Sequence, residues 1–230
     1  MDFHLLQLLL WIVAGALAGY FSLGNARAWT SIAVGFFLIL VGEALPRLVP
    51  YLHGTAAPRA AAMGLIVSTI AVLAMSHGFQ EYYVFSRTLE PSGSKLQVYL
   101  ATLAVLGASL VFVLVNISPD EAILRSIRIV ENSTWVFLSL INIDLIRKIY
   151  GGVKDSPIGM GFAAFIGVFA CILLWKGSEL YLLVYHLDHP LVQQLHPIRI
   201  QLSVICSNAG NFLAGLSVGG TFFYLSRMLR

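Results

Sequence analysis

The chain has 230 residues, of which 58% are hydrophobic and only 11% are charged, whereas soluble domains carry roughly a quarter charged residues. Together with a mean hydropathy of +0.84, this composition excludes a soluble domain and predicts an all-α, polytopic integral membrane protein. The formal net charge of +3 is explained by basic loops at the membrane surface, without a nucleic-acid partner.

Seven stretches are long enough to cross a hydrocarbon core of roughly 30 Å, which takes on the order of 20 mostly apolar residues. They predict a seven-transmembrane-helix bundle in a single domain, 1–230, with helices near 5–23, 29–45, 60–77, 96–117, 119–149, 158–187 and 198–225. The first stretch is preceded by Asp2 rather than by basic residues, so we expect no cleavage of a signal peptide.

The distribution of Lys and Arg favours an N-terminus outside and a C-terminus in the cytoplasm. The side expected to be cytoplasmic holds Arg27, Arg87, Lys95, Arg147, Lys148, Lys154, Arg227 and Arg230. The opposite side holds the smaller set Arg47, Arg59, Arg125, Arg128 and Arg199.

Two connections carry patterns of their own. The longest, 76–95, is rich in aromatic residues such as Tyr82 and Tyr83, which we expect to form a belt at the membrane interface. The segment SPDEAILRSIRIVE opens with Ser118 as an N-cap and Pro119 at the first helical position. It predicts an amphipathic entry to 119–149, with Glu131 on the polar face beside two arginines. This entry either lies at the outer interface or docks a partner protein.

A stripe of small or polar residues occupies every fourth position of the last helix: Ser203, Ser207, Asn211, Gly215 and Gly219. Helices associate in lipid through close backbone approach and interhelical hydrogen bonds. Rows with the same spacing are Gly15 and Gly19 in 5–23, and Gly159, Ala163, Gly167 and Cys171 in 158–187. We expect these three helices to pack closely. The alternatives are a seam between copies or a groove for another protein's helix, and Asn208 and Asn211 can bond across a seam or contact a substrate.

Four charged residues fall inside the predicted spans, where a charge is costly unless it is paired or hydrated. Glu43, Lys176 and Glu179 fall in the outer halves of their helices and are expected to share one cavity, with Lys176 and Glu179 three residues apart. Asp144 lies near the other end and is expected to pair with Arg147 or Lys148. For Glu43, Lys176 and Glu179 the sequence allows two interpretations, structural salt bridges or a hydrated ligand pocket.

The histidines suggest a weak candidate metal site. His53, His186, Asp188, His189 and His196 lie on the expected outer side, and imidazole with carboxylate can bind Zn, Cu or Fe. Their spacing matches no strong metal signature. We therefore expect no cofactor, with a metal or a haem between His53 and His186 as alternatives.

The leading functional hypothesis is a non-enzymatic membrane subunit, with a role such as signalling, that packs with partner membrane proteins or with its own copies. Its outward-facing polar and histidine cluster would be a ligand-sensing or structural site. The first alternative is a small-solute or ion transporter or channel that uses Glu43, Lys176, Glu179 and Asp144. The second is a haem- or metal-binding redox protein.

Overall fold

The computed structural model describes residues 3–25, 27–88, 100, 103, 104, 107, 111, 119–187 and 196–228. Over this part the chain is helical, and six helices are long and apolar enough to cross a membrane. They are α1 (Phe3–Leu23), α2 (Arg27–Leu48), α3 (Ala56–Thr88), α5 (Glu121–Val153), α6 (Pro157–Val184) and α8 (Pro197–Met228), with a short 3₁₀ helix η1 (Val49–Tyr51) after α2. The expected all-α membrane architecture is confirmed. The described residues give six spans rather than the expected seven, and the expected span 96–117 lies almost wholly outside them.

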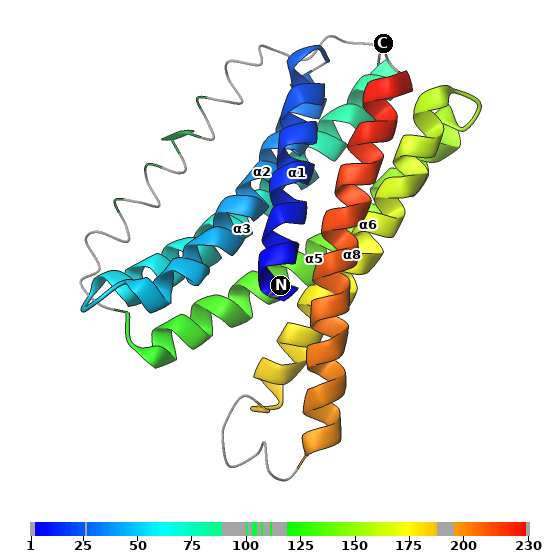
Figure 1. Cartoon of the computed structure of the whole chain (residues 1–230). Coiled ribbons are helices and arrows are strands. Elements are labelled where there is room, and N and C mark those ends of the chain that lie inside the picture. The colour runs from blue at the N-terminus through cyan, green and yellow to red at the C-terminus, as the bar shows by residue number, and fades with distance from the viewer. Residues whose placement is uncertain are drawn as a thin grey trace.

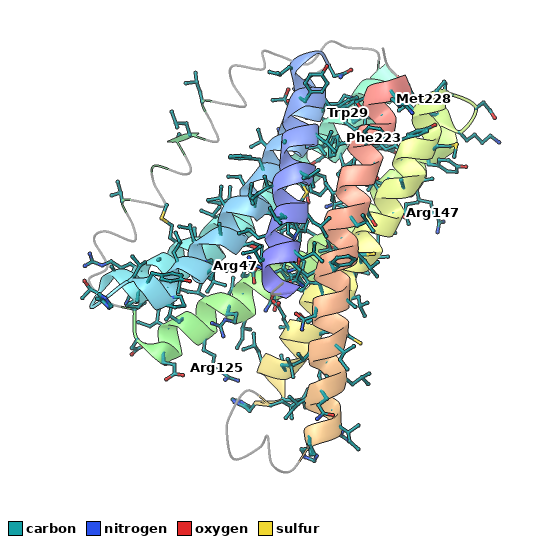
Figure 2. All side chains as sticks on the ribbon, viewed as in Figure 1. Trp29, Arg47, Arg125, Arg147, Phe223 and Met228 are labelled. Atoms are coloured by element: carbon teal, nitrogen blue, oxygen red, sulfur yellow. The ribbon has the colours of Figure 1, made fainter. Side chains whose placement is uncertain are left out.

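The six helices form a closed ring. Each helix contacts the next in the order α1, α2, α3, α5, α6, α8, and α8 contacts α1 again. In Figure 1, α1 lies between α2 and α8, while α6 and α8 extend past the start of α1 and away from the α2–α3 pair. We call the end where α1 begins the N-terminal end of the bundle. Arg47 and Arg125 lie toward this end, and Trp29, Arg147 and Met228 lie toward the other (Figure 2).

The start of α5 is set by its capping residue. The Asp120 carboxylate accepts a hydrogen bond of 2.8 Å from the backbone N–H of Ile123, and Glu121 follows in the first turn, where the helix dipole favours an acid. The expected cap at Ser118 is therefore wrong by two residues. Asp120 is the N-cap because its carboxylate accepts a hydrogen bond from a backbone N–H group that has no partner within the helix.

The end of α3 differs from the sequence expectation. The helix continues to Thr88, through most of the connection expected at 76–95. Phe79 packs at 5.3 Å from Phe165, and Tyr82 at 4.7 Å from Phe162, measured between ring centroids. Tyr82 is half-buried and packs against the core, and the packing of these rings extends the helix beyond its apolar window.

Aromatic side chains fill the middle of the ring. Phe165 is fully buried, and its ring lies 5.3 to 6.2 Å from four others, Trp29, Phe36, Phe79 and Phe222, contributed by α2, α3 and α8. A ring of six helices leaves a central space that only bulky side chains fill at normal packing density. This aromatic core closes the centre of the bundle.

The α2–α3 contact is built on small residues that repeat at intervals of seven. A Cβ at Gly35 would lie 2.8 Å from the Ala71 carbonyl oxygen, and one at Gly78 would lie 2.8 Å from that of Ala28. A Cβ at Gly42 would likewise lie 3.2 Å from the Gly64 carbonyl oxygen. Positions 35 and 42, and 64, 71 and 78, follow the spacing of a left-handed helix pair.

The small-residue stripe of α8 lies against both neighbouring helices. A Cβ added at Gly215 would be 3.4 Å from Leu10 Cβ, and one at Gly219 would be 3.8 Å from Ala14. Gly210, outside the stripe, makes the closest approach, since its Cβ would lie 2.5 Å from the backbone nitrogen of Trp175 in α6. Within the stripe, Ser207 donates a hydrogen bond to Glu179 of α6 at 3.3 Å. The stripe thus runs from α6 toward α1.

The matching rows on α1 and α6 are placed differently. Gly15 lies beside α2, where its Cβ would be 3.8 Å from Leu40. Within the described part of the chain, a Cβ at Gly19 or Gly167 would meet nothing within 4 Å, and Ala163 is exposed. Gly159 packs against Val153 and Lys154 at the α5–α6 turn. The residue spacing alone did not identify the face that each helix buries.

Candidate functional site

A buried ion pair joins α5 to α6 inside the ring. Lys176 Nζ lies 2.8 Å from Glu131 Oε1, and the two side chains are 5% and 1% exposed. The Lys176 ammonium also lies 4.2 Å from the centre of the Trp175 ring, a cation–π distance. The charge is thus held by a carboxylate and an aromatic face with almost no access to solvent.

Glu179 supplies a second carboxylate to the same lysine. Its Oε2 lies 3.4 Å from Lys176 Nζ, and its side chain is 33% exposed. Glu179 Oε1 accepts hydrogen bonds from Trp175 Nε1 at 2.7 Å and from Ser207 Oγ at 3.3 Å. Lys176 therefore lies between one sealed and one partly exposed carboxylate.

Two further side chains, Ser68 and Asn132, hydrogen-bond the two carboxylates. Ser68 Oγ of α3 donates to Glu131 Oε1 at 2.5 Å and accepts from Trp135 Nε1 at 2.9 Å. The Asn132 amide nitrogen, in the orientation that satisfies both ends of the amide, donates to Glu131 Oε2 at 2.9 Å and to Glu179 Oε2 at 3.1 Å. We call Ser68, Glu131, Asn132, Lys176 and Glu179 the polar centre.

Glu43 of α2 is linked to the polar centre by a chain of contacts through Asn211 of α8 and Trp11 of α1. Its carboxylate pairs with Arg47 Nη1 at 3.1 Å and accepts a hydrogen bond from Asn211 Nδ2 at 3.4 Å. Asn211 Oδ1 in turn accepts from Trp11 Nε1 of α1 at 2.8 Å. The Trp11 and Trp175 rings lie 6.1 Å apart, and Glu43 adds to the negative potential at Lys176. Together with Glu131 of α5 and Ser68 of α3, all six described membrane-spanning helices contribute a side chain to this group of contacts.

Among the residues that the structure describes, the charges of this network do not balance. Three carboxylates, those of Glu43, Glu131 and Glu179, contact two cations, Lys176 and Arg47. Burying an ion pair has a desolvation cost that rivals its Coulomb energy, so such pairs are weak devices for stability alone. With every group ionised, one negative charge is left over for a proton or a small cation to neutralise.

The sequence hypothesis for Glu131 is wrong. Glu131 was expected on an outer polar face with Arg125 and Arg128, but it is buried. It begins an inward face of α5 that continues through Trp135, Ser139 and Asn142. The spacing of four, four and three residues along that face was the available signal. Arg125 instead bonds the C-terminal end of α6, donating to the Leu183 carbonyl oxygen at 2.5 Å.

Two of the candidate polar residues lie apart from the centre or act through their backbone. Asp144 is on the surface of α5, 57% exposed, and pairs with Lys148 at 2.6 Å. The Asn208 carbonyl oxygen accepts a hydrogen bond from Gln7 Nε2 of α1 at 3.2 Å. Asp144 therefore lies apart from the other intramembrane charges and pairs with Lys148, one of its two expected partners, whereas Asn208 helps to hold α1 against α8.

The histidines do not assemble around a common point in the described residues. His53, His186 and His196 are exposed, and no group of three His, Cys, Asp or Glu side chains suited to a metal ion is found over the described ranges. Asp188 and His189 lie outside those ranges. His186 ends α6 in the left-handed region, with φ of 53°, and its Nδ1 lies 3.0 Å from Arg125 Nη2.

Comparison of the chain with protein-family models, with curated proteins and with solved structures finds no match. The polar centre is therefore the feature of this chain from which a function can be inferred.

Proposed function

We propose that this chain is a non-enzymatic membrane protein that translocates protons or a small monovalent cation through its polar centre. The observation that carries the proposal is the position of Lys176 between Glu131 and Glu179 within a ring of membrane-spanning helices. Ionisable groups inside a membrane bundle are expensive and characteristically mark ion pathways and proton relays.

The two carboxylates differ in a way that suits exchange. Glu131 is sealed, with Lys176 and Ser68 as tight partners at 2.8 and 2.5 Å. Glu179 is partly exposed and more loosely bound to Lys176, at 3.4 Å. A proton or cation arriving at Glu179 competes with the lysine ammonium, which then remains paired with Glu131. Lys176 thus acts as a tethered cation that an incoming charge displaces.

The position of the centre suggests the side from which charge arrives. The Glu43–Arg47 pair lies in the last two turns of α2, next to the N-terminal end of the bundle. The basic residues favour this end as the outer one. We therefore propose entry from outside, past Glu43 and Glu179, with the C-terminus of the chain in the cytoplasm.

Flux measurements in reconstituted vesicles test the proposal. Purified protein in phosphatidylcholine vesicles loaded with a pH-sensitive dye is exposed to a proton gradient, and the assay is repeated with Na⁺ and K⁺ gradients. We expect gradient dissipation above that of empty vesicles for one of these ions, and at least a tenfold loss with Glu179→Gln or Glu131→Gln. Wild-type vesicles as tight as empty ones to all three ions would refute the proposal.

Asp144→Asn is the matched control. It removes one carboxylate from the same membrane-spanning region, but at a surface pair with Lys148 outside the polar centre. Flux should remain at the wild-type level. An equal loss in Asp144→Asn and Glu179→Gln would attribute the effect to overall charge and not to the centre.

A second candidate is the membrane subunit that packs with partners. A groove of about 440 Å³ between α6 and α8 is lined by Met160, Ala164, Ser217, Gly220, Thr221 and Tyr224. Small residues on an outward helix face allow another helix to approach closely. Native mass spectrometry of gently extracted protein tests this candidate, which predicts heterologous subunits or defined homo-oligomers. A single chain alone would refute it.

A further inference from the structure

The interface between α3 and α5 contains buried polar atoms without a protein partner. Ser139 Oγ and Asn142 Oδ1 are both buried, and neither atom has a hydrogen-bond partner within the described structure. Both residues are 0% exposed. Their level is one to two helical turns beyond Trp135, away from the N-terminal end of the bundle.

Both residues face α3. Trp135, one turn before Ser139, donates to Ser68 of α3 at 2.9 Å, and Asn142, nearly one turn after it, donates to Ser76 of α3 at 3.0 Å. Positions 135, 139 and 142 share one face of a helix. Ser139 therefore lies between two contacts with the same neighbour. If the Asn142 amide is turned over, its nitrogen takes the place of the unpartnered oxygen, so one amide atom lacks a partner in either orientation.

Unpartnered polar atoms at this depth are costly, since the hydrocarbon offers no hydrogen bonds. Water is the ligand that satisfies such groups in protein interiors, where it typically makes about three hydrogen bonds to buried polar atoms. Ser139, Asn142 and Ser76 supply that number of partners, and Ser76 is only half-buried. The site is thus polar and lies next to a partly exposed residue.

We propose that the α3–α5 interface binds water between Ser76, Ser139 and Asn142, and that this water continues the proton route from Glu131 toward the end of the bundle where α5 ends. The inference deepens the proposed function and rests on it for the direction of proton movement. A proton that reaches the Glu131 carboxylate converts it to the acid and releases Lys176 from that ion pair. It leaves from Glu131 by way of the Ser68 hydroxyl of α3, which is hydrogen-bonded to that carboxylate, toward water on the α3–α5 side, and the carboxylate pairs with Lys176 again. The route passes beside the aromatic core and not through it.

X-ray hydroxyl-radical footprinting tests the water site without any transport assay. Radicals formed from bound water modify the side chains next to it, and Trp135 stands one turn from Ser139. Trp29, 3% exposed within the aromatic core, is the dry reference in the same molecule. We expect Trp135 to be modified several-fold faster than Trp29, and we expect the difference to shrink in Ser139→Ala and in the double variant Ser139→Ala/Asn142→Leu.

Ser133→Ala is the control, because Ser133 lies on the exposed face of the same helix and should leave both rates unchanged. Equal, slow modification of Trp135 and Trp29 in the wild type would overturn the water site. A Trp135 rate unaffected by Ser139→Ala would overturn it as well, and this single variant serves if the double variant does not fold.

Proton flux in vesicles then tests the route. The double variant should slow proton movement at least tenfold, whereas Ser133→Ala should not. Normal flux in the double variant would overturn the route. If the wild type moves no protons, the proposed function fails, while the footprinting result still decides whether water is bound.

Discussion

Lys176 Nζ lies 2.8 Å from Glu131 Oε1 at a point where neither side chain is more than 5% exposed. The pair connects α5 to α6, and the Ser68 and Asn132 contacts bring α3 and Glu179 into the same network. Removing one member of such a pair leaves a buried charge without its counterion, which is more damaging than removing both.

Lys176→Met should therefore lower the free energy of unfolding by about 3–5 kcal/mol, the cost of leaving a buried charge unpaired. Adding Glu131→Gln to Lys176→Met should recover part of that loss. Thermal unfolding of the two single variants and the double variant in detergent measures the coupling. Additive losses would show that the two side chains do not act as a pair.

Gly210 sets the distance between α8 and the helix that carries Lys176. In Gly210→Ala the new Cβ would lie 2.5 Å from the Trp175 nitrogen and 2.8 Å from the Cys171 carbonyl oxygen. These are backbone atoms that cannot move aside alone, so we expect a loss of about 1–3 kcal/mol. Gly220→Ala is the control on the same helix.

Within the described residues nothing lies within 4 Å of a Cβ at Gly220, and replacing a helical glycine by alanine stabilises by up to about 1 kcal/mol. The two variants should shift the thermal midpoint in opposite directions. Equal shifts would contradict the close α6–α8 approach.

His186 ends α6 with a left-handed backbone. The Leu187 N–H donates to the Leu182 carbonyl at 2.9 Å and the His186 N–H donates to that of Leu183 at 3.2 Å, the pattern of a Schellman cap. His186→Val should lower stability by about 1–2 kcal/mol, because a β-branched residue is strained at positive φ. His186→Gly should not lower it. A calorimetric unfolding temperature that is lower for His186→Gly than for His186→Val would contradict the cap.

Phe165 stands at the centre of the aromatic core and contacts rings from three other helices. Phe165→Ala should cost about 3–5 kcal/mol through the cavity it leaves. Phe137→Ala on α5, where the side chain is 63% exposed, should cost far less. Chemical unfolding of both variants measures the difference, and similar losses would argue against a packed centre.

The hydrophobic stretches predicted most of the fold. A segment that crosses lipid must hydrogen-bond its own backbone N–H and C=O groups, and an α-helix does so within one stretch of about 20 residues. The helix ends were less predictable. The start of α5 depends on the Asp120 side chain, and the length of α3 depends on packing of Phe79 and Tyr82 against α6. The cap is a local contact for which Ser118 and Asp120 both compete in the sequence, whereas the packing of α3 against α6 is not visible in the local sequence.

The polar centre was predicted in part. Charge inside apolar stretches pointed to Glu43, Lys176 and Glu179, and the structure brings all three into one network. Glu131 was missed because its arginine neighbours made the start of α5 resemble a surface helix. The α2–α3 glycines were missed because small residues were sought at intervals of four, whereas Gly35 and Gly42 are seven apart.

The most direct test of the central claim is infrared difference spectroscopy of the reconstituted protein between neutral and acidic pH. A carboxylic-acid carbonyl band should appear on acidification, disappear in Glu131→Gln or Glu179→Gln, and persist in Asp144→Asn. A spectrum that is the same in wild type, Glu131→Gln and Glu179→Gln would contradict it, because the buried carboxylates would then exchange no proton.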